Sequence, residues 1–240
     1  MPDLSGRITL VTGASRGIGY ASALAIAKAG SHVIATARTQ GGLEDLDDAI
    51  KEAGGQCTLV PMDLRDFDAM DRLGAVIAER YGRLDGLFSN AAMLGDITPA
   101  PHVTPKDWMK LVDVNFTAPY RQIRSLDPLL RASESGRAVF VTSSVARSHR
   151  AYWGAYAATK AGMEAFVSCY AKETEVTNLN VNLLDPGATR TAMRAKAVPG
   201  EDPQTLKTPA EVAKLAVEML SPDFTQTDSC VRYLDWAESA

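Results

Sequence analysis

The stretch TGASRGIG, residues 12–19, decides the fold. It follows an apolar run over residues 7–12 and precedes a helical pattern over residues 17–29. Glycine permits a tight turn and lets the backbone approach a phosphate closely. The amino end of the next helix then directs unpaired N–H groups and a positive dipole end at an anion. A glycine cluster can also be simple turn punctuation, but its place between a first strand and a first helix favours a phosphate site.

Short apolar runs alternate with helical patterns along the chain. Strands are predicted over residues 7–12, 32–37, 57–61, 86–89, 137–142, 180–184 and 230–234. Helices are predicted over residues 17–29, 41–53, 67–81 and 155–176, and two more begin at the capped pairs Thr104-Pro105 and Thr208-Pro209. This alternation predicts an α/β fold, in which a mostly parallel sheet of seven strands carries helices on both faces. We expect one doubly wound domain over residues 1–240.

Composition excludes several classes of protein. The net charge of -4 argues against electrostatically driven nucleic-acid binding. No apolar run approaches the roughly 20 residues that span a bilayer, and residues 1–6 do not resemble a signal peptide. Cys57, Cys169 and Cys230 fit neither a zinc spacing nor a disulfide framework. We therefore expect a cytoplasmic protein with no metal site and with neither nucleic acid nor membrane as a partner.

A tyrosine and a lysine stand one helical turn apart. Tyr156 and Lys160 occupy positions i and i+4 of a predicted helix and so share one face. A free tyrosine titrates at about pH 10, and an adjacent ammonium favours the phenolate, which lowers the pKa of the tyrosine. A hydroxyl poised in this way can exchange a proton with a substrate oxygen. Because the same spacing arises by chance in surface pairs, this interpretation needs support from other residues.

That support comes from a resemblance to a known family. Residues 12–19 resemble the Thr-Gly-x-x-x-Gly-[Ile/Leu]-Gly signature of the short-chain dehydrogenases/reductases. Ser143 precedes Tyr156 by thirteen residues, as in the family's Ser…Tyr-x-x-x-Lys pattern, whereas the neighbouring Ser144 does not fit this offset. Asn115 matches the family's mid-helix asparagine. The chain resembles a bacterial branch of the classical type, and the resemblance implies a Rossmann-like domain.

The resemblance also implies catalytic roles. Tyr156 would be the general acid in reduction and the general base in oxidation. Lys160 would lower the pKa of Tyr156 and bind the nicotinamide ribose, and Ser143 would donate to the substrate carbonyl. Asn115 would help to hold a water that links the lysine to solvent. The enzyme class implied is an oxidoreductase that acts on a CH–OH group with NAD(P) as acceptor.

The end of the second strand indicates which dinucleotide binds. The family places an acid for the ribose hydroxyls of NAD eighteen residues after the last glycine, and this chain has Ala37 there. Arg38 and Thr39 follow, and Arg16 lies within the glycine turn. Two guanidinium groups could clamp a 2′-phosphate. A lone Arg38 would be a solvated surface charge, but the missing acid and the two arginines together favour NADP(H) over NAD(H).

Further positions are expected to contact the cofactor by resemblance to the family. They are Gly13, Ser15, Arg16, Gly17, Ile18, Gly19, Arg38, Thr39, Asp63, Leu64, Asn90, Ala91, Tyr156, Lys160, Pro186, Gly187, Thr189 and Thr191. Asp63 could instead, or in addition, cap a helix, and residues 185–191 could be a simple strand-end turn. Ala92 departs from the family's glycine, so the local backbone shape is open there.

The substrate side is less defined by the sequence. Residues 187–207 form an irregular segment, which we expect to be a short substrate-side loop. The residues near the expected mouth are His149, Arg150, Tyr152, Trp153, Met193, Arg194 and Lys196. They suggest an aromatic wall and a basic rim suited to a polar or acidic carbonyl compound. Packing and solvated surface charge explain them equally well.

The predicted function is reversible hydride transfer between NADP(H) and a carbonyl or secondary-alcohol substrate. A 3-oxoacyl-thioester reductase is one specific form of this activity. A catalytically silent dinucleotide-binding regulator is an alternative from another class. An epimerase or dehydratase is disfavoured by the compact C-terminal part. Family resemblance implies a homodimer or homotetramer, formed through the long helices predicted over residues 105–131 and 155–176.

Overall fold

Seven strands form one sheet, and every neighbouring pair is parallel. The computed structural model describes residues 2–239. The strands are β1 (Ile8–Thr12), β2 (His32–Ala37), β3 (Gln56–Pro61), β4 (Gly86–Ser89), β5 (Arg137–Val141), β6 (Asn180–Asp185) and β7 (Cys230–Arg232). Their order is β3-β2-β1-β4-β5-β6-β7. The strand order reverses between β1 and β4, and open α/β sheets bind ligands at such a point. The predicted fold class is confirmed.

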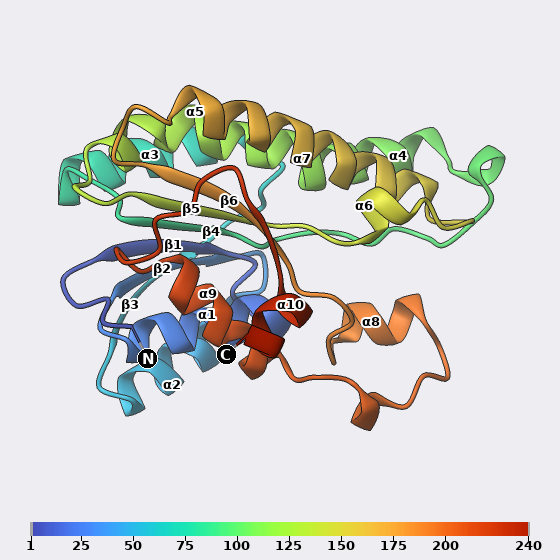
Figure 1. Ribbon diagram of the computed structural model, residues 1–240, viewed down its shortest axis with the longest axis horizontal. Helices are drawn as coiled ribbons and strands as arrows, with labels where there is room; N and C mark the ends of the chain where they lie inside the picture. The colour runs from blue at the N-terminus through green and yellow to red at the C-terminus, as the bar shows by residue number, and fades with distance from the viewer. Residues whose placement is uncertain (1, 240) are drawn as a thin grey trace.

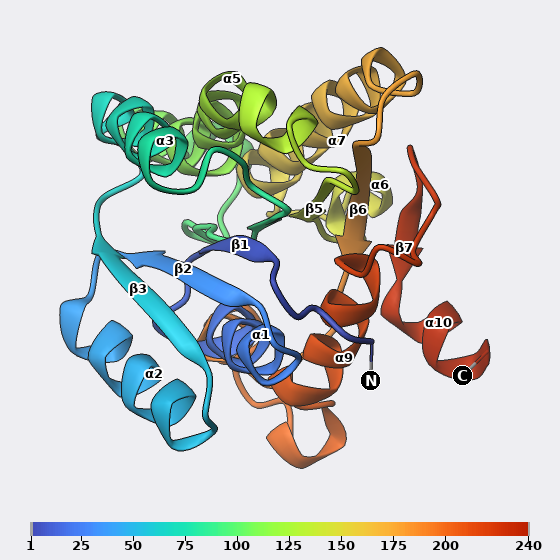
Figure 2. The ribbon, with the colours of Figure 1, turned by 90° about the vertical axis from the view of Figure 1, so that its left-hand side faces the viewer.

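Helices cover both faces of this sheet (Figure 1). On one face lie α1 (Gly17–Lys28), α2 (Gln40–Glu52) and α9 (Pro209–Met219), and on the other lie α3 (Phe67–Tyr81), α5 (Ala118–Arg131) and α7 (Gly154–Glu173). The shorter helices are α4 (Pro105–Val112), α6 (Val145–Ser148), α8 (Ala192–Ala197) and α10 (Tyr233–Ser239). Figure 2 shows the twist of the sheet from β3 to β7. Each face has its own buried apolar cluster, because the strands bury side chains on both sides.

The helix predicted from Thr104-Pro105 is not one regular α-helix. A π-helical turn at Asp113–Thr117 separates α4 from α5, and the N–H of Ala118 donates to the carbonyl of Asp113 five residues earlier. Asn115 lies within this turn. Single π turns occur often at functional sites, because the extra residue redirects a side chain.

Other differences concern short elements. α6 and α8 lie in segments for which no helix is predicted from the sequence. α10 begins at Tyr233, inside the strand predicted over residues 230–234. The helix predicted over residues 155–176 ends at Glu173. The predicted caps are confirmed: Thr104 accepts from the N–H of Asp107, and Thr208 forms a capping box with Glu211.

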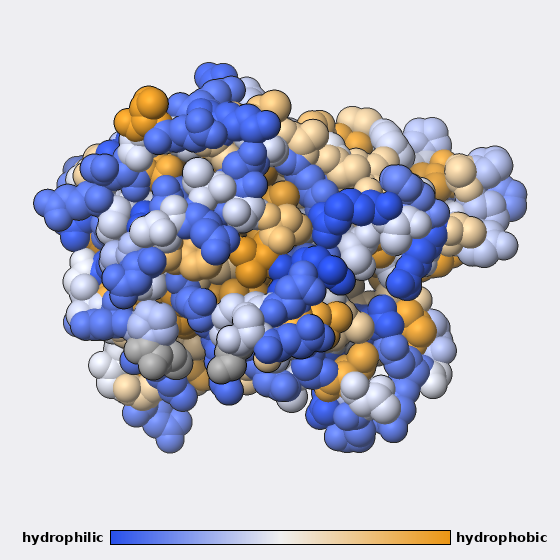
Figure 3. Space-filling model, viewed as in Figure 1, coloured by the Kyte–Doolittle hydropathy of each residue, from blue (hydrophilic) through white to orange (hydrophobic). Residues whose placement is uncertain are grey.

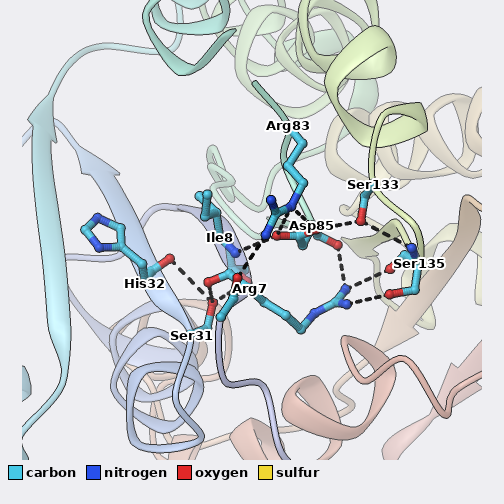
Figure 4. A network of polar contacts seen from close by, with 10 residues as sticks. Arg7, Ile8, Ser31, His32, Arg83, Asp85, Ser133 and Ser135 are labelled. Carbon is cyan, nitrogen blue, oxygen red and sulfur yellow. Dashed lines mark hydrogen bonds and ion pairs between the residues drawn. The ribbon is translucent and has the colours of Figure 1, made fainter. Parts of the chain in front are cut away.

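A buried polar network closes the amino end of the sheet (Figure 4). Arg7, at the start of β1, donates through Nη2 to the carbonyls of Asp85 and Ser135 over 2.7 and 2.8 Å. The carboxylate of Asp85 in turn accepts from Ser133 Oγ over 2.6 Å. These contacts join the segments that enter β1, β4 and β5. The network therefore positions the strands from the end opposite the glycine turn.

Candidate active site

The glycine turn after β1 has no room for a side chain at Gly13 and Gly19. Gly13 and Gly17 have φ values of 68° and 59°, which favour glycine. A Cβ on Gly19 would lie 2.2 Å from the carbonyl oxygen of Gly13, and a Cβ on Gly13 would lie 2.9 Å from Cα of Ala91. The turn therefore presents bare backbone at the amino end of α1. These residues fit a pyrophosphate, whose oxygens accept from such N–H groups.

Asn90 joins the turn to the neighbouring strand. Its Nδ2 donates to the carbonyl of Thr12 over 3.0 Å, and its backbone N–H donates to Thr12 Oγ1 over 3.0 Å. The N–H of Ala91 donates to the same hydroxyl over 3.1 Å. The ends of β1 and β4 are thus held together where the strand order reverses. This holds although Ala92 stands where the family has a glycine.

The predicted adenosine side is open and basic. Arg16, Arg38 and Thr39 are all exposed. A Cβ on Gly42 would lie 2.8 Å from the carbonyl oxygen of Ser15, so the amino end of α2 packs directly against the glycine turn. This contact brings the segment that carries Arg38 next to the turn that carries Arg16. Two free guanidinium groups beside a phosphate-sized turn fit a phosphorylated ribose.

Asp63 follows β3 on the same side. Its carboxylate pairs with Arg65, with 2.6 Å between Oδ2 and Nη2, and this hydrogen bond together with the weaker charge of Arg38 lowers the pKa of Asp63. Leu64 is buried beside it. The residue that caps α3 is Asp66, which accepts from the N–H of Ala69. The alternative in which Asp63 caps this helix is therefore wrong.

Tyr156 and Lys160 lie on the buried face of α7. Lys160 is 3% exposed, and its Nζ donates to the carbonyl of Val141 over 2.8 Å. The Tyr156 ring packs in a cluster with Val145. Val141 and Val145 stand on either side of Ser143 in the chain, so both side chains of α7 meet the segment that carries Ser143. Within residues 2–239, no hydrogen-bond partner occupies the hydroxyl of Tyr156.

Asn115 is fully buried next to this group. Its Oδ1 accepts from the N–H of Met93 over 2.8 Å, and its Nδ2 donates to the Met93 carbonyl over 2.8 Å and to Thr159 Oγ1 over 3.1 Å. Both amide donors are therefore used. The side chain of Asn115 thus joins the loop after β4 to Thr159 of α7, which directly precedes Lys160.

Burial dominates the titration of the buried pair. It raises the pKa of Tyr156, and the charge of Asp185 raises it further. Burial lowers the pKa of Lys160 to about 8, against the opposing charge of Glu164. The spacing of Tyr156 and Lys160 predicts a lowered pKa for Tyr156. That expectation does not hold here, because the ammonium of Lys160 is directed at a backbone carbonyl and both groups are desolvated.

The segment after β6 lies opposite the glycine turn. Gly187 has a φ of 61°, and its N–H donates to Asp185 Oδ1 over 3.0 Å, while Thr189 is buried. A Cβ on Gly17 would lie 3.5 Å from Thr191 Cγ2. The segment that resembles the family's nicotinamide-contacting sequence therefore adjoins the amino end of α1.

An apolar roof covers Tyr156. The Trp153 ring meets the Tyr156 ring edge-on with 6.2 Å between centroids. Leu94, Ile97 and Ala197 pack into the same cluster. The sequence analysis missed Leu94 and Ile97, because nothing local marks an apolar residue in a loop as a neighbour of a distant helix. Figure 3 shows a hollow in this part of the surface, between the region of α6 and the lobe that carries α8.

Two of the residues predicted to form a basic rim are paired with acids. Arg194 forms two hydrogen bonds of 2.6 Å with Glu201, and Lys196 pairs with Asp96 over 3.1 Å. His149 and Arg150 line a separate cavity of about 290 Å³ between α6 and α7. Arg194 and Lys196 therefore have acidic partners, whereas His149 and Arg150 belong to the lining of the cavity.

The comparisons with known proteins agree with this geometry. The sequence model for short chain dehydrogenases matches residues 7–202. The chain belongs to the short-chain dehydrogenase family. It is therefore an oxidoreductase of the class that acts on CH–OH groups with NAD(P) as acceptor.

Three relatives show how far the similarity extends. The oxidoreductase YciK of Escherichia coli (strain K12) is 41% identical over 223 residues, which cover 92% of this chain and 88% of YciK. A short-chain dehydrogenase of Escherichia coli CFT073, solved with NADPH, has a TM-score of 0.91 at 40% identity, over 96% of this chain and 97% of that one. One from Shigella flexneri 2a, solved with NADP, has a TM-score of 0.92 at 39% identity, over 96% and 98% of the two chains.

Two kinds of feature do not occur among residues 2–239. No helix there combines the length and the apolar character needed to cross a membrane. No three His, Cys, Asp or Glu side chains in that part of the chain converge as metal ligands would.

Proposed function

We propose that this short-chain dehydrogenase transfers a hydride between NADP(H) and a carbonyl compound or its secondary alcohol, with Tyr156 as the general acid/base. One observation carries the proposal. The Tyr156 hydroxyl is left without a protein partner, beside the Ser143 segment and one helical turn from the buried ammonium of Lys160. The ring of Tyr156 is buried, but its unpartnered hydroxyl is not among the atoms enclosed by the protein, so a substrate oxygen can reach it.

NADP(H) is the dinucleotide that we propose. Its pyrophosphate would lie on the bare backbone at Gly13 and Gly17, and its 2′-phosphate would lie between Arg16 and Arg38, with Thr39 as a further donor. The relatives solved with NADPH and NADP support this choice. The absence of an acid at Ala37 removes the group that would select NAD.

The remaining cofactor contacts are proposed on the geometry of the strand ends. Asn90, Ala91, Asp63 and Leu64 follow β4 and β3, next to the turn that holds Ser15, Ile18 and Gly19. Pro186, Gly187, Thr189 and Thr191 follow β6 opposite that turn and would meet the nicotinamide.

Tyr156 and Ser143 would handle the charge that develops on the substrate oxygen. When bound, the nicotinamide supplies or accepts the hydride. Tyr156 holds its proton near neutral pH because burial raises its pKa, so it is ready to donate in the direction of reduction. The Ser143 hydroxyl would donate to the same oxygen and stabilise negative charge there. In oxidation, Tyr156 would accept the proton instead.

Lys160 and Asn115 would support this proton transfer. The ammonium of Lys160 would stabilise a phenolate at Tyr156 and could donate to the nicotinamide ribose. Asn115 holds the Met93 loop with its side chain. A relay water for Lys160 would therefore bind the backbone of the π turn rather than the amide of Asn115.

The apolar roof indicates an uncharged, apolar substrate. Leu94, Ile97 and Trp153 surround Tyr156, while Arg194 and Lys196 are neutralised by their own acids. An acidic substrate would compete with Glu201 and Asp96 for these cations, whereas an apolar ketone or aldehyde would only bury surface. A 3-oxoacyl thioester is one substrate of this class, and its acyl chain would lie under the roof.

Self-association is proposed through the helices on one face. The exposed apolar side chains Trp108, Met109, Phe116 and Tyr120 lie along α4, the π turn and α5, and Phe116 lies against Gly162 of α7. Exposed apolar side chains gathered on neighbouring helices are typical of an interface. Light scattering after size exclusion would show a dimer or tetramer, whereas a monomer at micromolar concentration would contradict this proposal. We expect the protein to act in the cytoplasm.

A carbonyl panel tests the proposed function directly. Purified protein with NADPH is offered aliphatic and aromatic ketones and aldehydes, 3-oxoacyl thioesters, and 2-oxo acids, and loss of the reduced nicotinamide is followed. We expect turnover of uncharged carbonyl compounds, and kcat/KM at least tenfold lower for the 2-oxo acids (about 1.4 kcal/mol). If the whole panel is inert while NADPH binds, the alternative of a silent regulator replaces the enzyme.

A further inference from the structure

A cluster of four polar side chains lies behind the proposed proton-transfer residues. It comprises Thr142, Arg147, Glu164 and Asp185, which come from the end of β5, α6, α7 and the end of β6. Thr142 Oγ1 donates to Glu164 Oε1 over 2.6 Å, and Arg147 Nη1 donates to the same oxygen. Arg147 Nη2 donates to Asp185 Oδ2 over 2.7 Å. One guanidinium therefore bridges two carboxylates from different elements.

Each partner of Arg147 adjoins a part of the site. Glu164 follows Lys160 by one turn of α7, and Thr142 directly precedes Ser143. Asp185 uses its other oxygen to accept from the N–H of Gly187 in the nicotinamide segment. Arg147 is thus the point at which the serine, lysine and nicotinamide segments are held together.

Arg147 is the cation hydrogen-bonded to both carboxylates of this cluster, while the charge of Lys207 also acts on Asp185. Asp185 is 3% exposed and Glu164 has a side chain that is 15% exposed, so two carboxylates lie largely out of water. Arg147 is the cation that pairs with both. Removing one partner from such a group leaves an uncompensated buried charge. Cys230 of β7 also faces Arg147, but burial raises the pKa of its thiol, which stays neutral near neutral pH.

We propose that Arg147 is a positioning residue for the proton-transfer step, which holds Glu164 and Asp185 in place and neutralises their charge behind Lys160 and Tyr156. This inference rests on the proposed function of those two residues. It differs from a purely structural role in one respect. Loss of the guanidinium should change how Lys160 and Tyr156 titrate, and not only how stable the fold is.

The direction of that change follows from the two carboxylates. The charge of Asp185 acts to raise the pKa of Tyr156, and the charge of Glu164 acts to raise the pKa of Lys160. With Arg147 in place, both charges are partly compensated. Without it, negative charge nearby favours the protonated forms, so both pKa values should rise.

Titration of Lys160 by NMR tests the expected rise in its pKa without any need for turnover. The full chain is labelled with lysine carrying ¹³C at Cε, Lys160→Met assigns the signal, and spectra are recorded from about pH 6 to about pH 11. Lys160 should titrate near pH 8 in the unsubstituted protein. Arg147→Gln should raise that midpoint by about half a unit or more. Arg150→Gln, three residues further along and in the separate cavity, should not move it.

Three more variants separate charge from folding. Arg147→Lys keeps the charge and should leave the midpoint near its original value. Arg147→Gln with Glu164→Gln removes the uncompensated carboxylate and should reverse the rise. Glu164→Gln alone should lower the midpoint, which tests the account even if Arg147→Gln does not fold. An unchanged Lys160 midpoint in Arg147→Gln overturns the proposal. If Arg147→Gln does not fold, an unchanged midpoint in Glu164→Gln overturns it. A rise in the midpoint that persists in the double variant also overturns it.

The pH dependence of turnover is a second readout, which connects the charge of Arg147 to catalysis. In alcohol oxidation, Arg147→Gln should move the alkaline limb of the kcat profile to higher pH and lower kcat more than it raises KM for the alcohol. Unshifted limbs would also overturn the proposal. If the unsubstituted protein turns over no alcohol, the proposed function fails. The NMR titration still shows whether Arg147 affects the pKa of Lys160.

Discussion

Lys160 donates a hydrogen bond from Nζ to the carbonyl oxygen of Val141, over 2.8 Å, where β5 ends. The ammonium is 3% exposed and has no carboxylate as a direct hydrogen-bond partner among residues 2–239. A buried cation held by a backbone carbonyl is unfavourable for folding. The arrangement therefore indicates that the lysine is retained for what it does in the site.

The first prediction is that Lys160→Met stabilises the protein. Burial lowers the pKa of Lys160 from 10.5 to about 8, and that difference corresponds to about 3 to 4 kcal/mol of unfavourable folding free energy at neutral pH. The lost hydrogen bond to Val141 offsets part of the gain. Urea unfolding should show a net gain of about 1 to 2 kcal/mol, with Lys172→Met on the exposed end of the same helix as the control. A loss of stability would contradict the account of this buried charge.

The second prediction concerns pH. Between about pH 8 and pH 10.5 the unfolded chain binds one more proton at Lys160 than the folded chain does, so folding stability contributed by this group rises with pH in that window. Below the window, the unfavourable contribution is fully present. The difference in unfolding free energy between Lys160→Met and the unsubstituted protein should therefore shrink as pH rises from about 7 to about 10. A constant difference would mean that Lys160 titrates normally.

The third prediction separates two glycines. Gly19→Ala would place a Cβ 2.2 Å from the Gly13 carbonyl, between backbone groups that cannot move aside cheaply. It should destabilise the fold by about 1 to 3 kcal/mol and abolish NADPH binding. Gly41→Ala, in α2 with no atom within 4 Å of the new Cβ, should be neutral or stabilising by up to about 1 kcal/mol. Equal behaviour of the two variants would refute the tight turn.

The fourth prediction concerns the 2′-phosphate. Arg38→Gln should weaken NADPH binding at least tenfold, because a charge-assisted hydrogen bond contributes about 1.5 to 3 kcal/mol, and should leave NADH binding unchanged. Fluorescence titration of both dinucleotides measures this. Arg80→Gln, at the far end of α3 over the Tyr81 ring, is the matched control. A parallel loss of NADPH and NADH affinity would move the 2′-phosphate away from Arg38.

Much of this fold follows from local sequence. The glycines of residues 12–19 and the apolar strand runs act over a few residues, so the turn, the strands and the long helices were predictable. Helices as short as α6 and α8, with 4 and 6 residues, are too short to show a period. The interruption at Asp113–Thr117 also left no sign, because a π turn differs from an α turn by a single residue.

The electrostatics of the site depend on distant parts of the chain. Lys196 and Asp96 are 100 residues apart in sequence, so their pairing could not be predicted from either segment. The same holds for Arg147, whose partners are 17 and 38 residues away. The raised pKa of Tyr156 depends on burial, which is a property of the assembled fold. Family resemblance pointed to the residues proposed to react, and the structure shows what surrounds them.

The most direct test compares two tyrosines in carbonyl reduction with NADPH. Tyr156→Phe removes one hydroxyl and keeps the ring that packs against Trp153, while Tyr81→Phe removes a hydroxyl at the end of α3 that contacts His32. We expect Tyr156→Phe to lower kcat by at least about a hundredfold while the dissociation constant for NADPH stays within a factor of about two, and Tyr81→Phe to retain full activity. Undiminished turnover in Tyr156→Phe would remove this residue as the proton donor and contradict the proposed mechanism.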